Sequence, residues 1–151
     1  MPERKLAQLG LSLPVYRGPA ANYLPFKLHD GVIYLSGQGP RRPDGSYIIG
    51  KVGREFTTDE AFEHARLVAL GLLSVAKMAA GDLARVDVLK VFGMVNAVPE
   101  FGEHPKVING CSDLLVEVLG ERGRHARSAV GMSSLPNGMS VEIEAVMRIV
   151  N

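Results

Sequence analysis

The sequence has a single cysteine, Cys111, and no tryptophan among its 151 residues. One thiol cannot form an internal disulfide, and it cannot supply a multi-cysteine metal site. Aromatic residues make up only 6% of the chain, and the formal net charge is +1. Such a balance gives no general attraction to nucleic acid or anionic lipid, so we expect neither as a partner. A lone cysteine also favours a reducing, cytoplasmic location.

Long apolar runs are absent as well. No stretch approaches the ~18 apolar residues that a membrane-spanning helix needs, and the start, Met-Pro-Glu-Arg-Lys, does not resemble a secretion signal. The four histidines lack the spacing of metal ligands, and no cluster of acidic residues accompanies them. We therefore expect no membrane association, no metal and no other cofactor.

What the chain does contain is typical of one globular core. Hydrophobic residues make up 46% and charged residues 22%, values found in ordinary folded domains of this length. We expect a single domain over residues 1–151. Residues 1–20, with Pro14, Gly18 and Pro19, are expected to form an irregular lead-in to it.

Turn, cap and periodicity patterns predict the element order β-β-α-β-α-β-β. Asp30-Gly31 predicts a tight turn between the first two strands, and Thr57 with Glu60 forms a capping-box pattern that begins a helix. Two helices of this length cover one face of a mixed sheet, which predicts an α+β two-layer sandwich. The expected strands are Tyr23–Leu28, Val32–Leu35, Val86–Val95, Arg127–Met132 and Val141–Val150, and the second helix covers Lys106–Leu119.

The predicted sheet carries apolar residues on both faces. In the last strand, Val146 shares a face with Glu142 and Glu144, opposite an entirely apolar set. Because two helices cover only one face, a second cover is needed, and self-association supplies it most simply. We therefore expect a homo-oligomer with its pocket at the subunit boundary; the alternative is a strand that tolerates exposed valines. In the third strand neither face is polar throughout. Strict alternation places one set of apolar residues on one face, Val86, Val88, Phe92 and Met94, and a second set on the other, Leu89, Val91 and Val95.

Arg127 and Glu142 are the strongest candidates for chemistry. If Val130 and Met132 face the core, Arg127 projects onto the same open face as Glu142, from a strand expected to be its antiparallel neighbour. A guanidinium offers paired donors to a substrate carboxylate, and a glutamate can orient a water or move a proton. The pattern alone fits a structural Arg–Glu pair across the sheet equally well.

Weaker candidates lie elsewhere. Cys111 falls within an apolar helical stripe, which predicts a buried structural thiol. Arg122, Arg124 and His125 form a small basic group that can contact phosphate or simply lie in solvent. The run Ser36-Gly37-Gln38-Gly39 is not followed at once by a helix, which argues against a phosphate loop, although its backbone amides can approach a ligand closely.

Several of these segments together resemble one protein family. They are Ser36-Gly37-Gln38 at the end of the second strand, Arg127-Ser128-Ala129-Val130, the Leu135-Pro136 turn and Val141-Glu142-Ile143-Glu144-Ala145. In this order and spacing they are similar to the RidA family, also called YjgF or L-PSP endoribonuclease, from about Tyr23 to the C-terminus. Residues Pro105 to Gly110 resemble a divergent subgroup of that family.

The resemblance implies a chorismate-mutase-like fold and a homotrimer with clefts between subunits. It also implies hydrolysis of enamine and imine acids to 2-oxo acids and ammonia, as in 2-iminobutanoate/2-iminopropanoate deaminases. By that analogy Arg127 pairs with the carboxylate of a small metabolite, and Glu142 holds the water. The remaining cleft residues carried over are Tyr23, Ser36, Gly37, Asn109 and, through its backbone amide, Ala129.

Two other functions fit the same resemblance. One is a non-catalytic protein whose cleft binds a small metabolite without turnover. The other, from the family's older name, is RNA cleavage or inhibition of translation. Near-neutral charge, few aromatic residues and the lack of paired histidines argue against RNA as a substrate.

Overall fold

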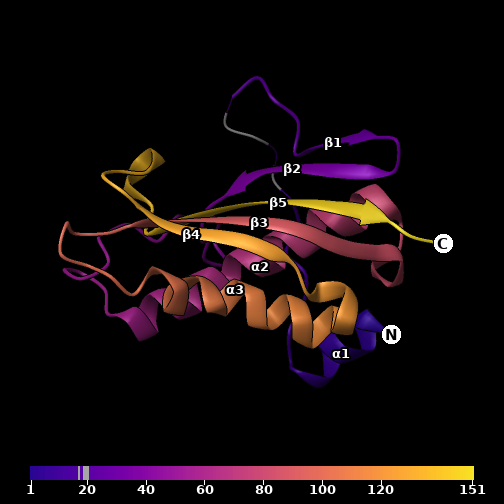
Figure 1. Ribbon diagram of the computed structural model, residues 1–151, viewed down its shortest axis with the longest axis horizontal. Coiled ribbons are helices and arrows are strands. Elements are labelled where there is room, and N and C mark those ends of the chain that lie inside the picture. Colours follow the sequence, from indigo (N-terminus) through magenta and orange to yellow (C-terminus); the bar gives the residue numbers. More distant parts are fainter. Residues whose placement is uncertain (17, 19–20) are drawn as a thin grey trace.

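The computed structural model describes residues 1–16, 18 and 21–151. Its strands form one mixed sheet in the order β1-β2-β5-β3-β4. Helices α2 and α3 lie side by side against one face of that sheet, and α1 packs beneath α3 (Figure 1). The α+β two-layer architecture is therefore confirmed. The elements are α1 (Pro2–Gln8), β1 (Phe26–His29), β2 (Val32–Gln38), α2 (Thr58–Ala80), β3 (Val86–Asn96), α3 (His104–Leu119), β4 (Ala126–Met132) and β5 (Val141–Ile149), with short 3₁₀ turns at Leu83–Arg85, Gly120–Gly123 and Pro136–Gly138.

The lead-in differs from the expectation of an irregular segment. Residues Pro2–Gln8 form helix α1, with Pro2 in its first turn, where the missing amide hydrogen costs least. Leu6 is buried in the main core, and Tyr16 packs against that core further along. So short a helix depends on tertiary packing, which the local pattern does not reveal. Pro19, which was also named as part of the expected lead-in, lies outside the described residues.

Two local predictions are confirmed in detail. Asp30 and Gly31 both have positive φ, at 48° and 76°, as a two-residue hairpin turn requires between β1 and β2. At the start of α2, the Thr57 side chain accepts from the Glu60 amide and the Glu60 side chain accepts from the Thr57 amide. This reciprocal capping box satisfies donors in the first turn and sets where the helix begins.

Strand β4 does not lie beside β5, as the sequence predicted. It pairs in parallel with β3, and β3 separates it from β5. The reason is the helix between them: a strand–helix–strand unit returns the chain over the sheet and leaves its two strands parallel neighbours. The connection that contains the Pro136–Gly138 turn therefore joins β4 to β5, on the other side of β3. It does not form a hairpin.

A bulge in β3 overturns the predicted alternation. The register against β5 shifts between Val88 and Lys90, and this shift moves Val86 and Val88 to the same face as Val91 and Val95. That face packs on the helices, whereas Phe92 and Met94 lie on the other one. A bulge adds one residue to a strand and so reverses the parity of everything beyond it.

The core lies between the sheet and the helices. The apolar set of β5 belongs to it, as predicted, and Val141, Ile143 and Met147 are fully buried. The opposite, open face is mixed: Tyr34 is 50% exposed, while Met94 is covered by a small cluster with Leu135 and Met139. No helix in the described part of the chain is both long and apolar enough to cross a membrane.

Candidate functional site

The residues predicted for a site fall into two groups on opposite sides of the sheet. Tyr23, Ser36, Gly37 and Glu142 gather around the end of β2. Arg127, Asn109 and Ala129 lie at the other edge, where β4 meets α3. Each group has its own local chemistry.

Gly37 and Glu142 form the centre of the first group. An added Cβ at Gly37 would lie 2.8 Å from Glu142 Oε2, so the glycine lets backbone and carboxylate approach closely. Glu142 is half-buried on the open face, opposite Met94 of β3. The Ser36 hydroxyl donates to the Leu24 carbonyl at 2.5 Å, and the Ser36 amide donates to Pro25. These bonds tie the segment before β1 to the end of β2.

The environment of Glu142 raises the pKa of its carboxyl. Burial is the main cause, and the nearby Glu144 carboxylate adds to it. A carboxyl whose pKa is moved toward neutrality exchanges protons more readily near pH 7 than an ordinary surface glutamate does. Burial and the neighbouring carboxylate thus both disfavour the ionised form of Glu142.

Arg127 is held against α3. Its Nη1 donates to Ser112 Oγ at 3.0 Å and its Nη2 to the Pro105 carbonyl at 3.2 Å. A guanidinium has five N–H donors, so these two bonds fix its orientation and leave others for a ligand.

The sequence interpretation missed Ser112 and His125, which orient Arg127. His125 Nδ1 donates to the Gly123 carbonyl at 2.7 Å, which leaves Nε2 as the acceptor for the Ser112 hydroxyl at 2.9 Å. Burial lowers the pKa of His125, so the neutral imidazole that this arrangement needs is favoured. The only signal in the sequence was the basic group around His125, which suggested a phosphate contact or solvent.

Asn109 and Ala129 accompany Arg127. Asn109 lies four residues after Pro105 and three before Ser112, on the stripe of α3 that Arg127 contacts. Ala129 pairs with Gly93 of β3 and packs toward the core. Because β4 is an edge strand, its outer main-chain groups have no strand partner among the described residues.

Arg127 and Glu142 do not share a face, and this part of the sequence interpretation is wrong. Arg127 pairs with the buried Val91 and so points to the helices, whereas Val130 pairs with Met94 on the open face. The parallel pairing of β4 with β3 sets this parity. Glu142 lies on β5, which is two strand spacings, or about 10 Å, from β4.

A pocket of about 440 Å³ opens beside the first group, a volume typical of small-molecule sites. It lies where β1 begins: Phe26, the first residue of β1, pairs with Leu35, so the last residues of β2 have no strand on their outer side. Helix α2 forms one wall, and the lead-in forms another, where Ser74 Oγ donates to the Pro14 carbonyl at 2.6 Å. Tyr23, Ser36 and Gly37 line the pocket.

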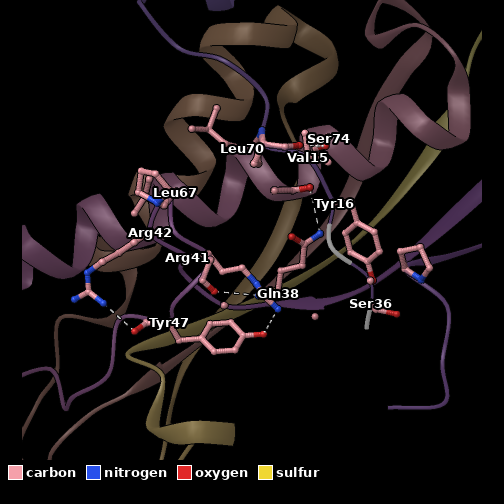
Figure 2. A pocket seen from close by; sticks show the side chains of 18 of the residues that line it. Val15, Tyr16, Ser36, Gln38, Arg41, Arg42, Tyr47, Leu67, Leu70 and Ser74 are labelled. Atoms are coloured by element: carbon pink, nitrogen blue, oxygen red, sulfur yellow. Dashed lines mark hydrogen bonds between the residues drawn. The ribbon is translucent and has the colours of Figure 1, made fainter. Parts of the chain in front are cut away.

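Arg41 and Gln38 lie near the middle of this pocket, between Tyr16 and Tyr47 (Figure 2). Gln38 Nε2 donates to the Gly71 carbonyl of α2 at 3.2 Å. The sequence interpretation named Ser36 and Gly37 but missed Arg41. The adjacent Arg41-Arg42 pair, directly after the glycine-rich end of β2, was the available signal.

The remaining candidates for chemistry are the thiol of Cys111 and groups of side chains that could bind a metal ion. Cys111 is fully buried, as predicted, and burial raises the pKa of its thiol to about 12, so the nucleophilic thiolate is disfavoured. Within residues 1–16, 18 and 21–151, no three histidine, cysteine, aspartate or glutamate side chains gather to hold a metal ion.

Known proteins resemble this chain over nearly its whole length. The family model "YjgF/chorismate_mutase-like, putative endoribonuclease" matches residues 3–142. Protein TCP17 of Trypanosoma cruzi is 40% identical over 97% of this chain and 92% of its own length.

Two solved structures show how the fold compares. One from Shewanella oneidensis, described as a "putative endoribonuclease", is 31% identical, covers 98% of this chain and 99% of its own, and has a TM-score of 0.94. RidA from a Psychrobacter species is 26% identical, covers 91% and 99% respectively, and has a TM-score of 0.59. The much lower value for RidA is consistent with a divergent subgroup of a shared fold.

Proposed function

Because this chain belongs to the YjgF/chorismate-mutase-like family, also called the RidA family, we propose that it hydrolyses enamine and imine acids to 2-oxo acids and ammonia. The proposed site is a cleft between subunits of a homotrimer in the cytoplasm. The observation that carries the proposal is the close approach of the Glu142 carboxylate to Gly37, a residue that also lines a pocket.

Two copies of the chain are needed to assemble this site. Within one chain, Arg127 and Glu142 lie on opposite faces of the sheet, with β3 between their strands. The edge strand β4 and the open face of the sheet both present surface that a neighbour can cover. In the proposed trimer, Arg127 and Asn109 of one subunit meet Glu142, Gly37, Ser36 and Tyr23 of the next.

The chemistry requires orientation more than strong activation. A protonated imine carbon is already electrophilic, and Arg127 holds the substrate carboxylate so that this carbon meets the water. Glu142 takes a proton from the water as the oxygen bonds to carbon, and passes it to the nitrogen. As the carbonyl forms, the hydroxyl proton moves through Glu142 to the departing ammonia. One iminium acid and one water thus give one 2-oxo acid and one ammonium, with Glu142 restored.

A coupled assay tests this proposal. A pyridoxal-phosphate dehydratase generates imine acids from several amino acids, and 2-oxo acid release is measured with and without the protein. We expect faster release with the wild type and loss of that acceleration in Arg127→Ala and Glu142→Gln. Arg54→Gln is the matched control, because Arg54 is exposed and pairs only with Glu55 among the described residues.

Different results select different functions. No acceleration over several amino acids, with 2-oxo acids still bound, contradicts turnover and supports a metabolite-binding protein. Acceleration that survives Arg127→Ala removes Arg127 from the site. RNA binding that weakens steeply with salt would instead support the endoribonuclease named in the family description.

A further inference from the structure

The pocket beside Gly37 has a charge pattern that the proposed reaction does not use. Arg41 and Arg42 both line it, and its lining includes no aspartate or glutamate. Among the ion pairs of the described residues, neither arginine has a carboxylate partner. Two guanidinium groups among the described residues thus line the pocket and can pair with an anionic ligand.

Arg41 is held in a fixed orientation. Its Nη2 donates to Tyr47 Oη at 2.6 Å, its Nη1 donates to the Gly45 carbonyl at 3.2 Å, and the guanidinium lies 4.3 Å from the centroid of the Tyr47 ring. These contacts occupy one side of the fork and leave further N–H groups to donate. A pre-positioned guanidinium loses little side-chain entropy when it binds a carboxylate.

The phenol groups of Tyr16 and Tyr47 lie near the Arg41 guanidinium. The Tyr16 phenol lies within electrostatic range of Arg41, Tyr23 and Tyr47, and burial is the main reason that its pKa is raised. Its hydroxyl therefore stays protonated and can donate to an anion. Figure 2 shows Tyr16 and Tyr47 on either side of Arg41 and Gln38.

Gly37 connects this pocket to the proposed reaction centre. Its backbone lines the pocket, and its α-carbon abuts the Glu142 carboxylate. A substrate whose reacting carbon lies by Glu142 can therefore extend its side chain past Gly37 toward Arg41. At about 440 Å³, the pocket also has more room than a methyl or ethyl side chain would fill.

We propose that this pocket binds the substrate side chain, and that Arg41 pairs with an acidic group on it, so that imines of acidic amino acids are preferred. This inference rests on the proposed function, since it assigns the substrate class of the same site. Leu67 and Leu70 offer apolar surface to an uncharged or aromatic side chain. Such an occupant would bury the guanidinium without pairing its charge, which is costly.

Binding of 2-oxo acids, measured by calorimetry, tests the preference with matched probes. 2-Oxoglutarate and 2-oxopentanoate have the same chain length and differ in the second carboxylate; phenylpyruvate represents an aromatic side chain. We expect 2-oxoglutarate to bind at least about tenfold more tightly than either of the others. Arg41→Gln should remove most of that difference, and Tyr47→Phe should reduce it. Arg54→Gln, which makes the same charge change outside the pocket, should preserve it.

Several results would overturn the inference. These are equal binding of 2-oxoglutarate and 2-oxopentanoate, tighter binding of phenylpyruvate, or a dicarboxylate preference that survives Arg41→Gln. The coupled assay separates this failure from failure of the proposed function. Equal acceleration for acidic and apolar imines contradicts the side-chain preference and supports the deaminase. A dicarboxylate preference in binding, without acceleration of any imine, supports the pocket assignment and contradicts the deaminase.

Discussion

Gly37 presents only a hydrogen atom to the carboxylate of Glu142. Any larger residue would place a carbon within contact of that side chain, as the 2.8 Å separation from an added Cβ indicates. The glycine thus has two consequences: it ends the regular part of β2, and it lets the carboxylate approach the backbone closely. The sequence pattern predicts that the strand ends near Gly37. It does not predict the contact between Gly37 and Glu142.

Gly37→Ala tests this contact. The new methyl group displaces the Glu142 carboxylate, and we expect 2-oxo acid release to fall at least about tenfold, because small misplacements of a catalytic group are costly. The fold should survive, since the three atoms nearest to the added Cβ all belong to the half-buried Glu142 side chain. If the loss acts through Glu142, Gly37→Ala should add little to Glu142→Gln in a double-mutant cycle. Additive losses would contradict that route.

Glu144 offers a test of the proton-transfer role through pH. Its carboxylate helps to raise the pKa of Glu142, after burial as the larger cause. Glu142 acts as a base only when ionised, so activity should fall as pH drops through its raised pKa. Glu144→Gln removes the repulsion, and the acidic limb of the kcat/KM profile should move to lower pH. An unchanged limb, or one that moves upward, would contradict the assignment.

Helices and strands followed from local patterns wherever the signal was local. The capping box at Thr57 set the start of α2, and the Asp30-Gly31 turn set the first hairpin. The pairing of β4 was predicted wrongly, because α3 returns the chain over the sheet and leaves β4 parallel to β3. The faces of β3 were predicted wrongly, because a bulge that no residue type indicates breaks its alternation. The face on which Arg127 lies depends on which strand is its neighbour, and that is a property of the whole sheet. Gly37 and Glu142 were identified, but Arg41 was not, because its pocket exists only once the lead-in packs against α2.

The crossing of α2 and α3 depends on Gly110. A Cβ at this position would collide with the carbonyl oxygen of Phe62 in the facing helix. Gly110→Ala must therefore push the helices apart, and we expect a loss of about 1–3 kcal/mol in the free energy of unfolding, as for overpacked cores. Gly102→Ala is the control, since nothing lies within 4 Å of its added Cβ. Chemical denaturation measures both; equal stability of the two variants would contradict the close crossing.

At the scale of the whole molecule, the predicted site residues form two separate groups. At the end of β2 lie the Glu142 carboxylate, the Gly37 backbone and a pocket lined by Arg41, whereas the edge formed by β4 and α3 holds the oriented guanidinium of Arg127. In the proposed roles, Arg127, which pairs with the 2-carboxylate of the substrate, and Glu142, which orients the water, belong to different groups. The uncovered sheet face lies between them, which is why we propose that function depends on assembly.

Subunit complementation tests this central claim most directly. Arg127→Ala and Glu142→Gln chains are each expected to be inactive alone. Unfolded together in equal amounts and refolded, they should form mixed trimers in which about a quarter of the sites pair an intact Arg127 with an intact Glu142 from the adjacent subunit. We predict recovery of about a quarter of wild-type activity, following the statistics of random mixing. Mixed trimers that remain inactive would contradict a site shared between two subunits.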